Sequence, residues 1–177
     1  TENSDFEKGQ GYGQFSFSYD KRFDIGAQVG IATQSYGANT FYSAKYNNQY
    51  EKTDHGLASL NLSLHDVAHT WEVTPTFYYN KFKDHYQLIR GKAGAAAGEN
   101  YHNLDVWGGS LNANISWFLG KTAVGFDISK ERIYSTALGE ALAEDKYKDI
   151  SGSDRQYTKK GERTNTNIML EHNFIFG

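Results

Sequence analysis

The chain has 177 residues, enough for one domain with its own core, and a net charge of −3. It contains no cysteine, which excludes a disulfide framework and a thiolate metal site, and its Lys and Arg residues form no dense cluster of the kind that binds nucleic acid. No run approaches the roughly 18–20 apolar residues of a membrane-spanning helix. A mean hydropathy of −0.68 is nevertheless compatible with a spanning β-barrel, in which only alternate side chains meet lipid.

Alternation of apolar and polar residues with a period of two predicts strands along most of the chain. Residues 1–9 are expected to be a polar leader, and residues 10–177 a single β region with long loops at 80–103 and 130–163. The predicted strands, in chain order, are 11–19, 23–31, 41–47, 58–64, 71–79, 104–119, 122–129 and 168–176. We therefore predict an all-β fold, an antiparallel up-and-down β-barrel or barrel segment of about eight strands.

The most regular stretch is the predicted hairpin at 104–129. Odd positions from Trp107 to Leu119 are apolar or small and even positions are polar, and the alternation resumes on even numbers from Thr122 to Ile128. The first arm exceeds the length of about 9–11 residues that a membrane-spanning strand needs and the second comes close to it, against a mode of about 5–6 in globular proteins. This hairpin is the strongest indication of a membrane barrel.

Three features of these strands predict local irregularities. Pro75 cannot donate to a ladder, so we expect an edge, a bulge or an interrupted pairing there. Gly108-Gly109 lies inside a strand pattern, where glycines mark a bulge or a close approach of another chain segment. Because Leu104 is apolar at an even position, before the odd positions take over, we expect a bulge or a switch of face at this point.

The connections are expected to be long at one end of the barrel and short at the other, as in outer-membrane barrels. Aromatic residues are expected at both lipid interfaces. Near the short turns we place Trp71, Trp117, Phe118, Phe174 and Phe176, and near the long loops Tyr19, Tyr78, Tyr79, Phe82 and Tyr134. The loop residues expected to contact a ligand are Tyr86, Arg90, Tyr101 and Tyr134, because binding residues concentrate on loops.

No residue pattern predicts catalysis or metal binding. Asp84-His85 is an acid–histidine pair, but adjacent residues on a strand point to opposite faces, so the pair is not arranged for general-base chemistry. The same reasoning applies to His65-Asp66. The histidines show no spacing typical of metal ligands. We therefore expect no enzyme activity, no cofactor and no metal site.

The region 71–140 resembles the barrel of TonB-dependent outer-membrane receptors of the Bacteroidetes type. The residues that carry the likeness are WEVTPTFYYNKFKDHYQLIRG at 71–91, NYHNLDVWGGSLNANISWFLGKTAVGFDIS at 100–129 and ERIYSTALGE at 131–140. The resemblance implies a bacterial outer-membrane location and energy-coupled uptake of a nutrient such as cobalamin, an iron chelate or a glycan, with the cobalamin branch as one option. It further implies an inner-membrane energy-transducing complex as partner, acting through a plug domain.

The likeness does not extend to a plug or an energy-coupling box, so it implies only the C-terminal part of a barrel of about 22 strands. Two other interpretations remain open at this point. The chain could close by itself as a small outer-membrane barrel with a structural or adhesive role, with Phe15 pairing near Phe174. It could also be a soluble β-barrel that binds a small molecule among inward-facing apolar residues.

Overall fold

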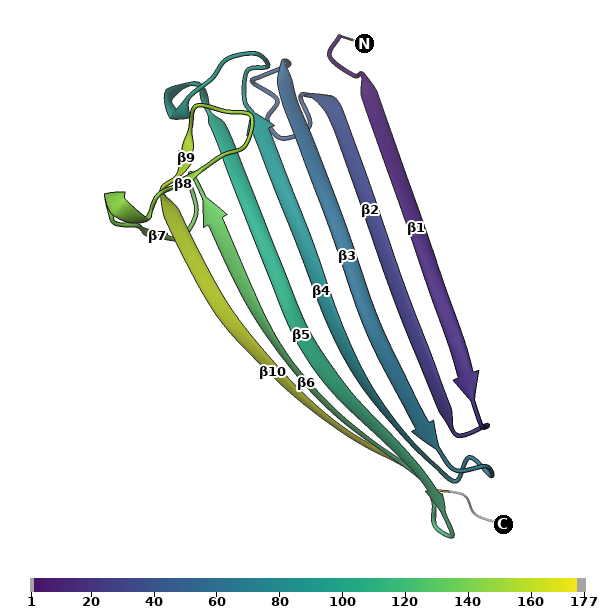
Figure 1. The fold of residues 1–177 in the computed structure, drawn as a ribbon. Coiled ribbons are helices and arrows are strands. Elements are labelled where there is room, and N and C mark those ends of the chain that lie inside the picture. The colour runs from purple at the N-terminus through teal and green to yellow at the C-terminus, as the bar shows by residue number, and fades with distance from the viewer. Residues whose placement is uncertain (1, 175–177) are drawn as a thin grey trace.

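The computed structural model describes residues 2–174 and is almost entirely β, which confirms the predicted fold class (Figure 1). The strands are β1 (Phe6–Tyr19), β2 (Phe23–Asn39), β3 (Gln49–His65), β4 (Trp71–Gln87), β5 (Glu99–Trp117), β6 (Gly120–Ser135), β7 (Glu140–Ala141), β8 (Lys148–Asp149), β9 (Gln156–Tyr157) and β10 (Lys159–Phe174). Eight of them form one antiparallel sheet in the order β1-β2-β3-β4-β5-β6-β10-β7, and β8 pairs with β9. Two short 3₁₀ helices, η1 (Ala95–Ala97) and η2 (Glu144–Lys146), lie in the loops.

Seven of the strands in the main sheet are long, and the prediction of a strand at 41–47 was wrong. That segment is a loop, stabilised by local bonds such as Phe41 N–H to the Ala38 carbonyl (2.8 Å) and by the buried side chain of Gln49, whose Nε2 donates to the carbonyl of Tyr46 (2.8 Å). Without a strand at 41–47, short turns and long loops alternate along the chain. Turns 20–22, 66–70 and 118–119 form the short-turn rim, and loops 40–48, 88–98 and 136–158 form the long-loop rim.

The long strands extend further than predicted. β1 begins at Phe6, inside the expected leader, and the two expected long loops shorten to 88–98 and 136–158. The extra residues lie toward the long-loop rim, where polar side chains occupy both faces of the sheet. Backbone pairing therefore continues there after the apolar alternation has ended.

The register places the apolar residues of all seven strands on one face. One cross-strand row is apolar throughout, and it consists of Tyr19, Phe23, Leu64, Val73, Ala113, Val124 and Leu170. A row on the opposite face is polar or small, and it consists of Gln14, Gln28, Ser59, Tyr78, Gly108, Ser129 and Asn165. We name these surfaces the apolar face and the polar face.

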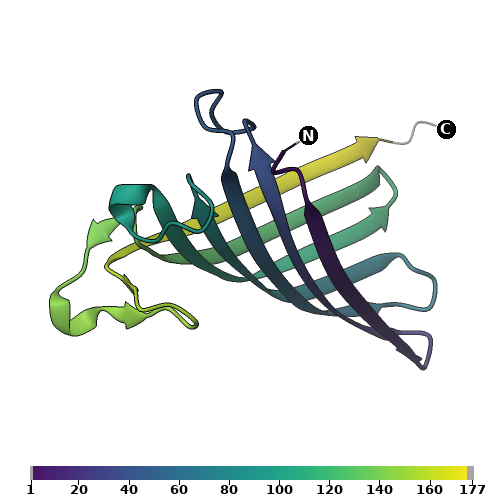
Figure 2. The ribbon, with the colours of Figure 1, turned by 90° about the horizontal axis from the view of Figure 1, so that it is seen from above.

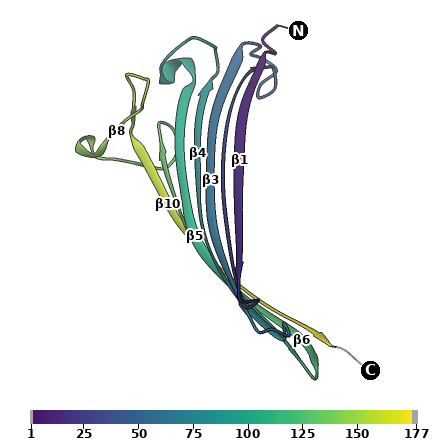
Figure 3. The same ribbon diagram turned by 45° about the vertical axis from the view of Figure 1, so that its right-hand side comes forward.

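The sheet is curved and open, with β1 and β10 at opposite sides (Figures 2 and 3). Large apolar side chains on the apolar face are exposed, for example Phe77 (59%) and Leu170 (74%). Buried strand positions such as Thr53, Gly125 and Ser129 lie on the polar face, as the shielded inside of a curved sheet would place them. No helix among the described residues is long and apolar enough to cross a membrane.

The expected irregularities are only partly present. Pairing of β3 with β4 is interrupted between Asn61 and Leu64, opposite Pro75, which confirms the interrupted ladder. The register of β5 is continuous with both neighbours, so the bulge is absent near Gly108, whereas the alternatives of a close approach and a switch of face are present. Leu104 instead lies on the polar face.

Gly108 is a site of close approach. A Cβ atom at this position would lie 2.5 Å from the Tyr78 hydroxyl and 2.8 Å from the backbone oxygen of Ile128. The Tyr78 hydroxyl crosses over the glycine to donate to Asp127 Oδ2 (3.0 Å).

Most of the aromatic residues predicted near the short turns lie at that rim. Trp71, Trp117, Phe118 and Phe174 lie at the short-turn rim, whereas Phe176 is outside the described residues. Tyr19 also lies there, beside the first turn, so its assignment to the other rim was wrong. Of the residues assigned to the long-loop side, Tyr79 and Tyr134 are on the apolar face, and Tyr78 and Phe82 are on the polar face.

We expect Gly108→Ala to lower the free energy of unfolding by about 1–3 kcal/mol, because the methyl group overlaps Tyr78 and a backbone oxygen that cannot move independently. The measurement is urea unfolding of the refolded protein in detergent. Gly56→Ala is the matched control, since no atom lies within 4 Å of a Cβ atom built there. Equal stability of the two variants would contradict the close approach.

Candidate functional site

The polar face carries a cavity of about 360 Å³ at the long-loop rim, beyond the apolar residues of the same strands. Glu51 of β3, Asp84 and Tyr86 of β4, and His102 of β5 contribute to it because cross-strand pairing aligns their positions. Its complete lining is Tyr42, Glu51, Asp84, Tyr86, Asn100 and His102. The cavity therefore combines two carboxyl groups with aromatic walls.

Hydrogen bonds hold most of these side chains in place. Glu51 accepts hydrogen bonds from the hydroxyl groups of Tyr36 (2.6 Å to Oε2) and Tyr42. The Tyr86 hydroxyl donates to Gln49 Oε1 (2.7 Å). Since Gln49 also binds the 40–48 loop through its Nε2, one buried amide connects the loop to the cavity wall.

Asp84 is the unusual group of this cavity. Its Oδ1 atom is buried and has no hydrogen-bond partner among the described residues. Burial, together with the nearby charge of Glu51, raises the pKa of Asp84 to about 6. Burial also lowers the pKa of His102, whose Nδ1 lies 2.8 Å from Ser135 Oγ. Near neutral pH the cavity thus presents acceptors to a ligand that brings hydroxyl, amine or cationic donors.

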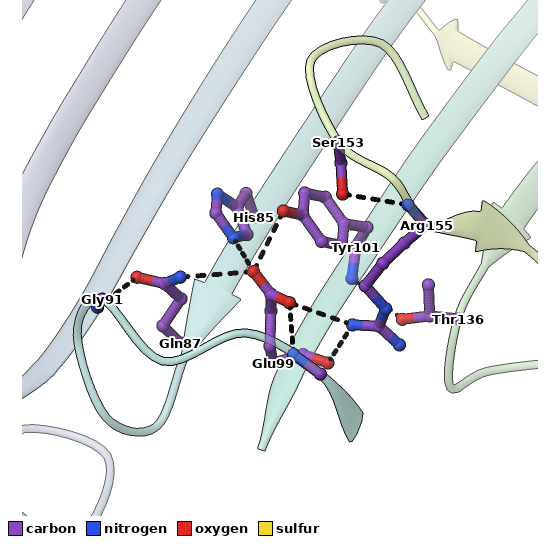
Figure 4. Close-up of polar contacts among 9 residues, drawn as sticks. His85, Gln87, Gly91, Glu99, Tyr101, Thr136, Ser153 and Arg155 are labelled. Carbon is purple, nitrogen blue, oxygen red and sulfur yellow. Dashed lines mark hydrogen bonds and ion pairs between the residues drawn. The ribbon is translucent and has the colours of Figure 1, made fainter. Parts of the chain in front are cut away.

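A second polar cluster lies on the apolar-face side of the same rim, and its centre is Glu99, the first residue of β5 (Figure 4). The Glu99 side chain is 3% exposed. It accepts hydrogen bonds from His85 Nε2 (2.8 Å), Gln87 Nε2 (3.2 Å), the Tyr101 hydroxyl (3.0 Å), the Gly94 N–H (2.8 Å) and Arg155 (3.3 Å). Groups from β4, β5 and two loops therefore meet at one carboxylate.

The protonation state of Glu99 follows from these contacts. Burial alone would raise its pKa, but the hydrogen bonds from Gly94, His85, Gln87 and Tyr101 outweigh it and lower the pKa to about 2. The arrangement connects the 88–98 loop to the segment around Arg155, and all five partners are donors to the ionised form. A fully occupied carboxylate of this kind organises loops and has no acceptor capacity left for a ligand.

The structure does not bring the four predicted ligand-loop residues together. Tyr86 lines the polar-face cavity, whereas Tyr101 belongs to the Glu99 cluster and stacks on His85 (4.1 Å between ring centroids). Arg90 forms two hydrogen bonds to Asp5 (2.5 and 2.9 Å) and lies over a tyrosine ring. Tyr134 lies beneath Lys148 Nζ, 3.9 Å from the ring centroid.

Several cavity residues were not predicted from sequence. Glu51 was assigned to a loop, although it lies in β3, and Asn100 was also assigned to a loop, although it lies in β5. The even or odd parity of these positions would have placed them on the polar face if the strands had been extended. The prediction that Asp84 and His85 point to opposite faces is confirmed, since they contribute to different clusters. Within residues 2–174, no group of three or more His, Asp or Glu side chains is arranged to hold a metal ion.

Asp84→Asn is expected to raise the melting temperature more at pH 8 than at pH 4. A carboxyl group whose pKa is higher in the folded chain destabilises the fold as the pH rises from its ordinary pKa of 3.8 through about 6, and asparagine removes this cost. Melting in one detergent at both pH values measures the effect. Asp154→Asn, at an exposed loop position, is the control. An equal gain at both pH values would count against a raised pKa.

The chain was compared with known proteins at the level of family, sequence and structure. No protein-family model, curated protein or solved structure matches it.

Proposed function

We propose that the chain forms part of the barrel wall of a TonB-dependent outer-membrane receptor, which takes up a nutrient such as cobalamin, an iron chelate or a glycan. The observation that carries the proposal is the continuous, exposed apolar face across seven antiparallel strands. The opposite face of the same strands carries mainly small or polar side chains. A soluble sheet would cover such a face with a second layer. The strands themselves do no chemistry in this proposal.

The height of the apolar surface supports a membrane span. On β5 it extends from Trp107 to Trp117, which corresponds to about 34 Å along a strand at about 3.4 Å per residue. At a strand tilt of about 40°, this length covers about 26 Å across the membrane, close to the apolar band of about 25 Å in outer-membrane barrels. A tryptophan lies at each end of this segment, as expected at lipid interfaces.

Strand direction favours a wall segment over a self-contained small barrel. Because seven long strands alternate in direction, β1 and β10 both run from the long-loop rim to the short-turn rim (Figure 1). Closing the sheet on itself would pair these strands in parallel, whereas single-chain bacterial barrels are antiparallel with an even strand number. The sheet is accordingly open between β1 and β10.

The apolar face could meet either membrane lipid or a small molecule bound inside a soluble barrel. The pattern of burial favours lipid. In a soluble ligand-binding barrel the apolar side chains would point inward and be shielded. Here Phe77 and Leu170 are exposed, and the buried positions Thr53, Gly125 and Ser129 are on the polar face. The cavity around Asp84 then faces the lumen, where a polar nutrient would pass.

Leu111→Arg is expected to impair insertion into outer-membrane-like vesicles by about 2–4 kcal/mol, because it places a charge in the middle of the apolar band. Asn112→Arg is the matched control on the adjacent, polar-facing position of the same strand. Insertion is measured by the heat-dependent shift in electrophoretic mobility after refolding. If both variants insert equally well, the apolar face does not meet lipid.

The receptor function is tested by uptake in cells of the source bacterium with and without the gene. We expect loss of the gene to abolish energy-dependent uptake of one labelled ligand among cobalamin, ferric chelates and oligosaccharides. A protonophore should abolish the same uptake in the parent strain, because transport is coupled to inner-membrane energy. Unchanged uptake of all three classes would reject the receptor proposal.

A further inference from the structure

A groove of about 600 Å³ crosses β1 to β4 on the apolar face, at the boundary between the apolar band and the polar strand extensions. Two adjacent cross-strand rows form it. Each row begins with a glycine of β1 and ends with a lysine of β4, and the rows are Gly9, Thr33, Asp54, Lys83 and Gly11, Ile31, Gly56, Lys81. Its volume lies in the range of about 300–1,000 Å³ that is typical of small-molecule sites.

The groove exists because three of its floor positions have no side chain. No atom lies within 4 Å of a Cβ atom built on Gly56. The same is true of Gly13, the next residue of β1 on this face, so the open floor continues toward the apolar band. Ile31, which is 69% exposed, supplies an apolar surface between these glycines.

The charges of the groove lie at its β4 side. Lys81 Nζ forms an ion pair with Asp105 (2.9 Å), whereas Lys83 is exposed and forms no ion pair among the described residues. Asp54 is paired in register with Lys83 on the neighbouring strand. An incoming group therefore meets two ammonium groups, one of them unpaired, and a carboxylate that accepts hydrogen bonds.

We infer that this groove binds one phosphate-bearing membrane lipid, with its phosphate at Lys83 and Lys81 and an acyl chain that passes Gly56, Ile31 and Gly13 and continues onto the apolar band. The inference rests on the proposed membrane location of the apolar face. Long lysine side chains at the edge of an apolar band place their ammonium groups at headgroup level. Asp54 accepts a hydrogen bond from a headgroup hydroxyl or amine, which favours a headgroup that carries such a donor.

The test is native mass spectrometry of the purified chain in detergent, titrated with phosphatidylglycerol or with diacylglycerol of the same acyl chains. We expect selective retention of phosphatidylglycerol. Gly56→Leu, which fills the floor, and Lys83→Gln, which removes the unpaired charge, should each reduce its apparent affinity about tenfold, as the loss of a charge-assisted contact does. The two variants change different parts of the groove, so a folding defect in one leaves the other informative.

Two control variants match these changes outside the groove. Ala113→Leu adds bulk to the apolar face on β5, and Lys92→Gln removes a charge from an exposed loop. Both should bind phosphatidylglycerol as the parent does. Equal binding by the parent, Gly56→Leu and Lys83→Gln would overturn the groove site, and equal retention of diacylglycerol would overturn the phosphate contact.

Failure of this inference is distinguishable from failure of the proposed function. A chain that stays folded and monodisperse in plain buffer and does not enter vesicles contradicts the membrane proposal itself. A chain that inserts normally, but binds lipid equally well with and without the substitutions, contradicts only the groove site.

Discussion

The antiparallel register is the constraint on which the rest of this structure depends, and it shifts only between Gly37 and Asn39, at the end of β2, among the long strands that the structure describes. Each strand alternates its side chains with a period of two, and a slip by one residue would move its apolar residues to the other face. The rows that run from Tyr19 to Leu170 and from Gln14 to Asn165 exist only because all six neighbouring pairs keep compatible registers. Even the interruption opposite Pro75 preserves the register on both sides of it.

At the long-loop rim, side-chain positions are determined by hydrogen bonds and not by the alternation of apolar and polar residues. Two buried polar residues, Gln49 and Glu99, each connect a loop to strand residues of the sheet. Burial of such groups is tolerated because their hydrogen-bonding capacity is used. Asp84 departs from this rule, since its buried Oδ1 has no hydrogen-bond partner among residues 2–174, and the same holds for Asn103 Oδ1 and His172 Nε2.

The alternating strands could be predicted from sequence, whereas the hydrogen-bonded clusters of the long-loop rim could not. The alternation from Trp107 to Trp117 predicted both the strand and the face of each residue. In a regular strand the face of a side chain alternates from one residue to the next, so the local sequence is enough to assign it. The aromatic alternation of Tyr42 and Tyr46 predicted a strand incorrectly, since the side chain of Gln49 binds the backbone of this segment and stabilises turns. The Glu99 cluster could not be predicted, because its partner Arg155 is 56 residues away and is brought near by the loop.

In the proposed barrel, the shared direction of β1 and β10 restricts the strands that would complete the wall. The edges of both strands are open, β1 along its length and β10 between Gly161 and Asn173, in the part of the chain that the structure describes. A ring in which every neighbour is antiparallel contains an even number of strands, and this sheet supplies seven long ones. In such a barrel, the other strands would therefore be odd in number, and both strands next to β1 and β10 would run from the short-turn rim to the long-loop rim.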